Sequence, residues 1–414
     1  MKKIQYFACG IALFSLASCS NPADMSSDET LADAYEITNM VARGDGDGEM
    51  AIGNDNNGGA AKENFDAEAG TLTAGEWSDL NNWGFWQSLM QKEMFFEYQK
   101  QWKFYPTQRY SVRVTDKVGQ PVLDCKVALL NKDKKELWTA KTNNAGIAEL
   151  WAQPFSEEKD LNNTIVVDYN GTQQKIKHPE TFIKGVNNVE LPVTASAPGN
   201  NADVMFVVDA TGSMEDEIAY LKKELADVVG QVKTKYPDLT LQIGSVFYRD
   251  KGDEYVTRSA ALSADASATI NFIDQQAADG GGDYPEAVDA ALIDAVSQQN
   301  WSASAKTRIV FLMLDAPPHH DNASLTSLHN TIQKAAAKGI KIIPIASSGI
   351  DKDTEFLMRF MSMATNGSYV FMTDHSGVGN SHIEPTVGEY RVEYLNDLLT
   401  RMITQSLEPV SVLE

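Results

Sequence analysis

The sequence predicts an α/β fold with a doubly wound, mostly parallel sheet, preceded by a small all-β sandwich domain. Two observations predict the sheet: the apolar run 204–208 has the length of a buried parallel strand, and helical stretches separate it from similar runs. The other apolar runs lie at 241–247, 309–314, 340–345 and 369–372, and the helical stretches include 215–232, 285–296 and 325–337. Strand and helix are expected to alternate throughout this domain, which we bound at 201–407.

The N-terminus predicts export. Two lysines precede an apolar run, 4–16, which ends in Leu-Ala-Ser-Cys at Cys19 and is too short to span a bilayer. Residues 1–18 resemble a bacterial lipoprotein signal, which implies that Cys19 becomes the lipidated first residue of a membrane-anchored chain. The alternative is a plain signal peptide with an incidental cysteine. Ser20 does not match the Asp that retains enteric-type lipoproteins in the inner membrane, so an outer-membrane location in the cell envelope is favoured, with the periplasmic or surface face left open.

Cysteine usage and net charge restrict the possible disulfides and the class of partner. Cys9 leaves with the signal and Cys19 carries lipid, so Cys125 alone remains and no intramolecular disulfide is expected. The formal net charge of -22 repels nucleic acid and anionic lipid headgroups. We therefore expect no nucleic-acid partner.

Residues 19–75 are rich in Asp, Asn, Gly and Ala, which predicts a disordered acidic tether. Two motifs lie inside it: Arg-Gly-Asp at 43–45, a tripeptide that some integrins bind, and 45–49, which is similar to the start of a calcium loop. The loop lacks its closing bidentate Glu, because Asn56 stands there. A soluble linker explains both motifs better than binding does.

Residues 76–106 form an aromatic-rich segment with helix-like spacing. Its apolar residues are Trp77, Trp83, Phe85, Trp86, Leu89, Met90, Phe95, Phe96, Tyr98 and Trp102. Such a density predicts either a segment packed on the following domains or a surface that binds a partner or glycan. Packing is favoured, because the segment immediately precedes a folded domain.

Residues 107–194 predict the β-sandwich. Alternation at 111–115, a strand at 127–130 and turns around Gly119 and Gly146 support this interpretation. The region resembles the carboxypeptidase-regulatory-like domain, a small module without catalytic groups. Residues rich in Ala, Ser, Pro and Gly, 194–200, link it to the α/β domain.

Oxygen-bearing side chains follow the strand at 204–208. Asp209, Thr211 and Ser213 share one turn, and Gly212 lets that turn fold back. The carboxyl ends of parallel strands are where open α/β sheets bind ligands. A carboxylate and two hydroxyls suit Mg²⁺ or another hard cation. An Asp after a strand can also be a simple helix N-cap, which is the alternative interpretation.

Two further loops complete the pattern. A strand at 309–314 ends in Asp315, and the glycines at 280–282 precede Asp283. Together these resemble the metal-ion-dependent adhesion site of the von Willebrand factor A-type (VWA) domain. The resemblance implies that Asp209, Thr211, Ser213, Asp283 and Asp315 hold Mg²⁺, Mn²⁺ or Ca²⁺. Thr211 replaces the usual Ser and Asp283 the usual Thr, so the site carries an additional negative charge.

Enzymatic alternatives find little support. A haloacid-dehalogenase-type phosphatase needs a second Asp where Thr211 stands, and the sequence contains no Gly-x-Ser-x-Gly, phosphate-loop or His-Glu-x-x-His motif. Residues 319–321, His-His-Asp, could bind a transition metal, but a rim loop is the favoured interpretation.

The sequence thus predicts a lipid-anchored cell-envelope protein, not an enzyme, that binds another protein or peptide through a divalent cation. A partner carboxylate is the ligand that the family resemblance implies. The alternatives are an envelope assembly or scaffold factor with a purely structural metal and, last, an unrecognised metal-dependent hydrolase.

Overall fold

The computed structural model describes residues 67–158 and 162–408. The predicted signal peptide 1–18, the lipidation site Cys19 and most of the predicted tether 19–75 lie outside the described residues. Within the described ranges, no helix has both the length and the apolar character needed to cross a membrane.

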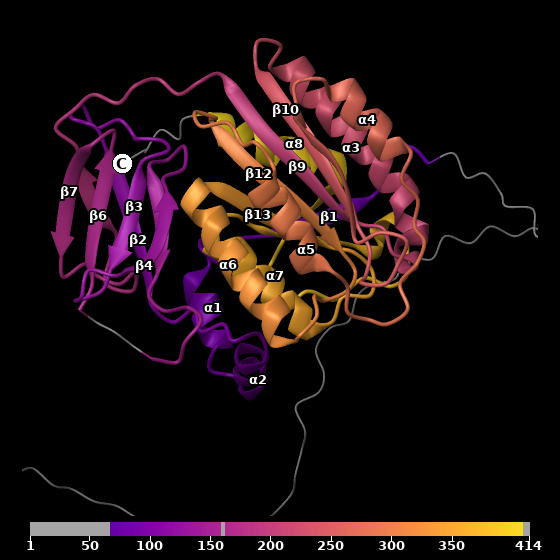
Figure 1. The fold of residues 1–414 in the computed structure, drawn as a ribbon, viewed down its shortest axis with the longest axis horizontal. Helices are drawn as coiled ribbons and strands as arrows, with labels where there is room; N and C mark the ends of the chain where they lie inside the picture. The colour runs from indigo at the N-terminus through magenta and orange to yellow at the C-terminus, as the bar shows by residue number, and fades with distance from the viewer. Residues whose placement is uncertain (1–66, 159–161, 409–414) are drawn as a thin grey trace, which may run out of the picture. The chain divides into compact units, whose positions relative to one another are not determined.

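The central sheet has eight strands in the order β11-β10-β9-β12-β13-β14-β1-β15 (Figure 1). The strands β10, β9, β12, β13 and β14 pair with one another in parallel, whereas β11 pairs antiparallel with β10, and β1 pairs antiparallel with both β14 and β15. This arrangement confirms the predicted mostly parallel sheet. In chain order the strands are β1 (Thr73–Trp77), β9 (Asn201–Asp209), β10 (Thr240–Tyr248), β11 (Thr257–Ser263), β12 (Thr307–Leu314), β13 (Ile340–Ala346), β14 (Tyr369–Met372) and β15 (Val392–Tyr394).

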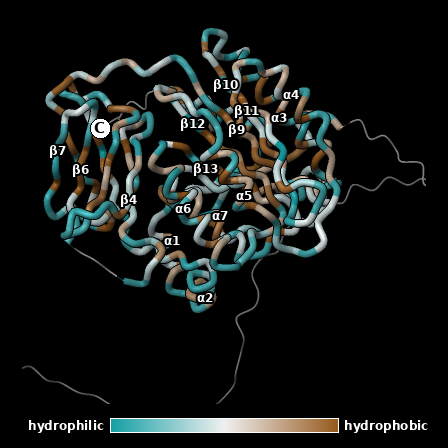
Figure 2. The backbone as a smooth tube through the Cα atoms, in the orientation of Figure 1, coloured by the Kyte–Doolittle hydropathy of each residue, from teal (hydrophilic) through white to brown (hydrophobic). Residues whose placement is uncertain are grey.

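Helices cover both faces of this sheet. Side chains of β9 alternate between two hydrophobic clusters, with Phe206 and Val208 in one and Met205 and Val207 in the other. The first cluster contains residues of α3 (Glu215–Lys235), α4 (Ala266–Asp274) and α8 (Leu395–Leu407). The second contains residues of α5 (Val288–Ile293), α6 (Asn322–Lys338) and α7 (Lys352–Ala364). Figure 2 shows hydrophobic residues along the central strands and hydrophilic residues in many of the surrounding loops.

Two details of the prediction for this domain were wrong. Strand and helix do not alternate throughout, because β10 is followed directly by the antiparallel strand β11. The helix expected from residue 285 begins at Val288, because Glu286 pairs with Pro318 in an extended bridge, and its end continues as a π-helical turn, Asp294–Gln298. The methionine-rich stretch 356–363 is buried in α7.

Strand β1 corrects the predicted end of the tether at residue 75. Residues 73–77 pair with β14 on one side and with β15 on the other, so the central sheet takes one strand from before the all-β region. The approach to β1 is fixed by Glu224 of α3, which is fully buried. Its carboxylate accepts the backbone N–H groups of Gly70, Thr71 and Leu72, each at 2.9 Å.

The aromatic-rich segment forms α1 (Trp83–Leu89) and α2 (Glu93–Trp102). Trp86 stacks on Phe356 of α7 at 5.6 Å between ring centroids, and Trp102 is fully buried. The packing interpretation is therefore confirmed for most of these aromatic residues. Phe96 is the exception, since half of it is exposed.

The described residues between 109 and 190 are all-β, as predicted. They form a three-stranded sheet, β5-β2-β8, and a four-stranded sheet, β4-β3-β6-β7, and the buried apolar residues of both sheets, except Ala128, belong to one cluster. The strands are β2 (Arg109–Thr115), β3 (Lys126–Leu130), β4 (Glu136–Lys141), β5 (Ile147–Trp151), β6 (Thr164–Tyr169), β7 (Thr172–Lys177) and β8 (Asn187–Glu190). The resemblance of this region to the carboxypeptidase-regulatory-like domain stays a prediction.

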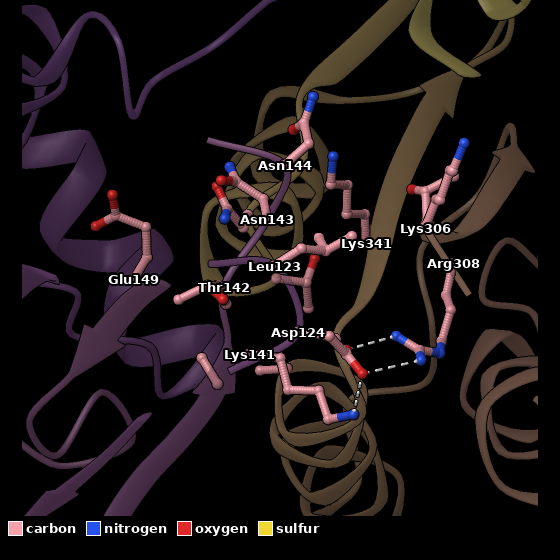
Figure 3. A pocket seen from close by; sticks show the side chains of 17 residues that line it. Leu123, Asp124, Lys141, Thr142, Asn143, Asn144, Glu149, Lys306, Arg308 and Lys341 are labelled. Carbon is pink, nitrogen blue, oxygen red and sulfur yellow. Dashed lines mark hydrogen bonds and ion pairs between the residues drawn. The ribbon is translucent and has the colours of Figure 1, made fainter. Parts of the chain in front are cut away.

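An ion-paired joint connects the all-β region to the central sheet. Asp124, before β3, accepts hydrogen bonds from Arg308 of β12 and Lys141 of β4, both at 2.9 Å (Figure 3). The cavity beside them measures about 30 Å³, enough for little more than one water molecule. The Arg308 and Lys141 side chains therefore stabilise the contact between the all-β region and the central sheet.

Candidate metal centre

The first loop of the site follows β9. Asp209 is the last residue of β9 and is fully buried. Its carboxylate oxygen Oδ1 accepts the backbone N–H of Thr211 at 2.9 Å and the Thr211 hydroxyl at 2.7 Å. The Thr211 hydroxyl lies 3.2 Å from that of Ser213. Gly212 passes so close to Gly280 that an added Cβ would lie 3.0 Å from the Gly280 carbonyl oxygen. Close approach to the 280 loop thus explains the small residue in this turn.

Asp315 comes from the neighbouring strand end. Because β12 pairs with β9 in parallel register, with Met313 opposite Val208, the residues that follow both strands meet at one edge of the sheet. Asp315 is 4 % exposed. Its Oδ1 and the Oδ2 of Asp209 are buried without any hydrogen-bond partner.

The third predicted loop reaches the same place. Asp283 is exposed. Together with Ser213 and Asp315 it lines a cleft with a volume of about 310 Å³. The structure therefore brings all three predicted loops together, with Asp209 and Thr211 behind the cleft and Ser213, Asp283 and Asp315 along it.

The sequence interpretation missed Glu286, which also lines this cleft. Glu286 is 3 % exposed, and its Oε2 has no hydrogen-bond partner. The sequence indicates only a helix start there, although the position of Glu286 three residues after Asp283, beside a glycine-rich loop, is a signal for a site residue. Its backbone N–H donates to the Pro317 carbonyl at 2.8 Å, which fixes the carboxylate inside the site.

Crowded carboxylates set the electrostatics. Burial raises the pKa values of Asp209 and Asp315, and the charge of Asp209 raises that of Asp315 further. Burial, followed by the charges of Asp209 and Asp250, raises the pKa of Glu286 to about 9. Tyr248, buried beside this cluster, also has a raised pKa, first from burial and then from the charge of Asp209.

A hard divalent cation fits this donor set. The buried carboxylate oxygens Asp209 Oδ2 and Asp315 Oδ1 lack partners, and the Thr211 and Ser213 hydroxyls belong to the same loop as Asp209, which matches the oxygen ligands that Mg²⁺ or Ca²⁺ prefers. Among the described side chains, no group of three or more His, Cys, Asp and Glu residues is arranged to hold a metal by itself. A shell here would consequently depend on the hydroxyls as well as the carboxylates.

The His-His-Asp sequence serves three separate contacts. His319 pairs with Asp250 at 2.6 Å, and the His320 ring lies 4.1 Å from that of Trp102. Asp321 caps α6 by accepting the N–H groups of residues 323 and 324. These contacts agree with the favoured interpretation of a rim loop.

Comparison with known proteins identifies the α/β domain. Residues 203–381 match the family model of the von Willebrand factor type A domain. This part of the chain is a VWA domain. VWA domains mediate protein–protein interactions, often bind a divalent metal ion and are generally not enzymes.

Similarity to whole proteins is partial. The alpha-protein kinase vwkA of Dictyostelium discoideum is 22% identical over 226 residues, which cover 54% of this chain and 35% of the kinase. A putative ariadne-like RING finger protein of Acanthamoeba polyphaga mimivirus is 35% identical over 121 residues, which cover 28% of this chain and 11% of that protein. The chain thus spans about a third and a tenth of the lengths of these two relatives.

Solved structures resemble half of the chain. The conserved hypothetical protein BatB from Bacteroides thetaiotaomicron has a TM-score of 0.34 and 12% identity, covering 50% of this chain and 98% of its own. An aerotolerance-related membrane protein from Bacteroides fragilis has a TM-score of 0.32 and the same identity and coverage.

Proposed function

We propose that the VWA domain binds a partner protein or peptide through a divalent cation, Mg²⁺ or alternatively Mn²⁺ or Ca²⁺. The residues proposed to hold the cation are Asp209, Thr211, Ser213, Asp283 and Asp315. The observation that carries the proposal is the pair of unpartnered carboxylate oxygens, on Asp209 and Asp315, buried beside two hydroxyls at the base of an open cleft.

The residues have different tasks in this proposal. Asp209 and Asp315 supply negative charge from two adjacent strand ends, and the hydrogen bonds from Thr211 hold the Asp209 carboxylate in one orientation. Ser213 and Asp283 lie along the cleft, where a partner can approach. When bound, the cation supplies an electrophilic position for a carboxylate oxygen of the partner.

We also propose that the chain is anchored in the cell envelope through lipid on Cys19, in the outer membrane. The lipobox-like sequence supports this proposal. A tether between the anchor and Gly70 would let the VWA domain reach partners away from the membrane surface.

Calorimetric titration of Mn²⁺ and Mg²⁺ into the detergent-solubilised full chain tests the metal centre. Asp209→Ala should weaken affinity by at least about tenfold, since even residues that only support a ligand commonly cost that much. Asp216→Ala is the matched control, because Asp216 is an exposed carboxylate in the first turn of α3. Equal affinity in wild type and Asp209→Ala would reduce the motif to an ordinary capped turn.

Partner binding is tested separately, by pull-down from envelope extract with and without chelator. Chelator-sensitive capture that Asp209→Ala abolishes supports metal-bridged binding. Capture that survives both treatments favours the alternative, a scaffold factor with a structural metal. Metal-dependent turnover of a substrate would instead favour a hydrolase.

A further inference from the structure

The cleft has a second wall that carries none of the proposed metal ligands. This wall consists of four residues that line the cleft beside the proposed ligands: Tyr284, Ser348, Gly349 and Asn380. The Tyr284 hydroxyl donates to the Gly349 carbonyl at 3.1 Å, which joins two of the loops that form this wall. Asn380 is exposed, and its side-chain amide carries both donors and an acceptor.

Glu217 of α3 holds this wall in place. It is 1 % exposed, and its Oε1 accepts the backbone N–H of Ser348 at 3.1 Å. The segment 377–382 packs directly on the same oxygen: Gly379 has φ +82°, and an added Cβ would lie 2.4 Å from it. Because α3 begins two residues after Ser213, one helix supports both the first metal loop and this second wall.

His382 fixes the far end of the segment 377–382. Its ring is 2 % exposed and lies between two carboxylates, with Nε2 3.4 Å from Glu217 and Nδ1 2.8 Å from Asp374. The backbone N–H of His382 also donates to Asp374 at 2.8 Å. A ring with a carboxylate at each nitrogen is held most firmly as imidazolium, which donates from both. Burial lowers the pKa of His382, but the neighbouring carboxylates of Glu217 and Asp374 outweigh burial and raise it.

We infer that the segment 377–382 contacts the partner, and that Asn380 pairs with a peptide group of an extended partner segment beside the acidic side chain held at the metal. This inference rests on the proposed function. An amide side chain matches the N–H and C=O of a peptide group, which a lone carboxylate does not offer. The cleft of about 310 Å³ lies at the small end of ligand pockets, so it fits one extended segment. Glu217 and His382 are positioning residues for Asn380.

Two probes separate recognition of the peptide group from recognition of the carboxylate. The first is an end-blocked pentapeptide, Gly-Gly-Asp-Gly-Gly, and the second is acetate, which has a carboxylate but no peptide group. Both are titrated into the Mn²⁺-loaded full chain, and Mn²⁺ affinity is measured separately. Asn380→Ala should weaken pentapeptide binding about fivefold, the effect of one lost hydrogen bond, and leave acetate and Mn²⁺ binding unchanged. Ser381→Ala, an exposed neighbour outside the cleft lining, is the control and should bind like wild type.

The positioning residues are tested in the same assay. His382→Ala should weaken pentapeptide binding and spare acetate and Mn²⁺ binding, whereas His375→Ala, an exposed histidine next to Asp374, should change neither. Wild-type pentapeptide affinity in Asn380→Ala would overturn the inference, and wild-type affinity in His382→Ala would overturn the positioning role. If the wild-type chain binds neither probe in Mn²⁺, the proposed function itself fails.

Discussion

Replacing Asp79 with Asn tests how the segment before the all-β region is fastened to the VWA domain. Asp79 lies just after β1, and its carboxylate forms two hydrogen bonds with Arg359 of α7, at 2.8 and 2.6 Å. Both residues are 1 % exposed. The indole N–H of Trp77 donates to the same carboxylate at 2.9 Å. This pair therefore connects the strand β1 to a core helix.

The expected cost follows from these surroundings. Breaking a buried ion pair by removing one partner costs about 3–5 kcal/mol, because the other charge stays buried without compensation. Arg359 would keep the Thr386 carbonyl as an acceptor, and Glu355 lies 3.9 Å away, so we expect the lower end of that range. A loss of about 3 kcal/mol is a large share of a typical folding free energy.

Urea denaturation of the full chain measures this cost as a lowered midpoint with an unchanged slope. Glu97→Gln is the control: it removes an ion pair of the same segment, with Lys100 at 2.8 Å, in which both side chains are more than half exposed. That variant should unfold like wild type. The double variant Asp79→Leu with Arg359→Met should recover much of the lost stability, since neither member of the ion pair then stays buried without the other. If Asp79→Asn lowers the free energy of unfolding by less than about 1 kcal/mol, the Asp79–Arg359 pair does not fasten β1 to α7 as described.

Four further predictions concern the site and the anchor. Thr211→Ser should leave Mn²⁺ affinity nearly unchanged in calorimetry, because the hydroxyl is kept, whereas Asp315→Ala should reduce it; the reverse order would exclude the proposed shell. Asp283→Thr should weaken metal affinity, since one negative charge is lost, yet strengthen capture of an acidic partner; unchanged affinity would mean that Asp283 is not a ligand. His382→Gln should cost more stability at pH 6 than at pH 9 in urea denaturation, because a raised histidine pKa stabilises the fold below its unfolded value of about 6.5, and this stabilisation is lost as the pH rises through the folded value; an equal cost at both pH values would contradict this. Cys19→Ala should move the protein from the membrane fraction to the soluble fraction, and recovery with unchanged detergent partitioning would exclude the anchor.

Local sequence patterns predict much of the candidate metal centre. Asp209, Thr211 and Ser213 lie within five residues of each other, directly after an apolar run, so strand, turn and donor types can all be read from one short stretch. Asp315 follows another such run. Parallel strands bring their carboxyl ends to one edge of a sheet, so the sequence already predicts that these loops meet there.

Other parts of the site depend on contacts between residues far apart in sequence. From sequence alone, Glu286 belongs to a helix start. Asp209 and Asp315, which lie near it in space, are far from it in the chain, so only packing makes Glu286 a buried carboxylate of the same cleft. Glu217 and His382 are likewise brought together by the return of the chain after β14. Residue spacing reports which face of an element is buried, but it does not report which distant group that face meets.

The sequence by itself determined the doubly wound sheet, the all-β region before it and the strand-end loops, because periodicity, turn residues and donor types are local properties of the chain. Tertiary structure alone decided that residues 73–77 enter the central sheet between β14 and β15, that Glu286 joins the loops of the candidate metal centre and that Glu217 supports the second wall of the cleft. The physical reason is that strand neighbours and buried charge contacts are selected by the free energy of packing the whole chain, to which a short window of sequence contributes only one side of each contact.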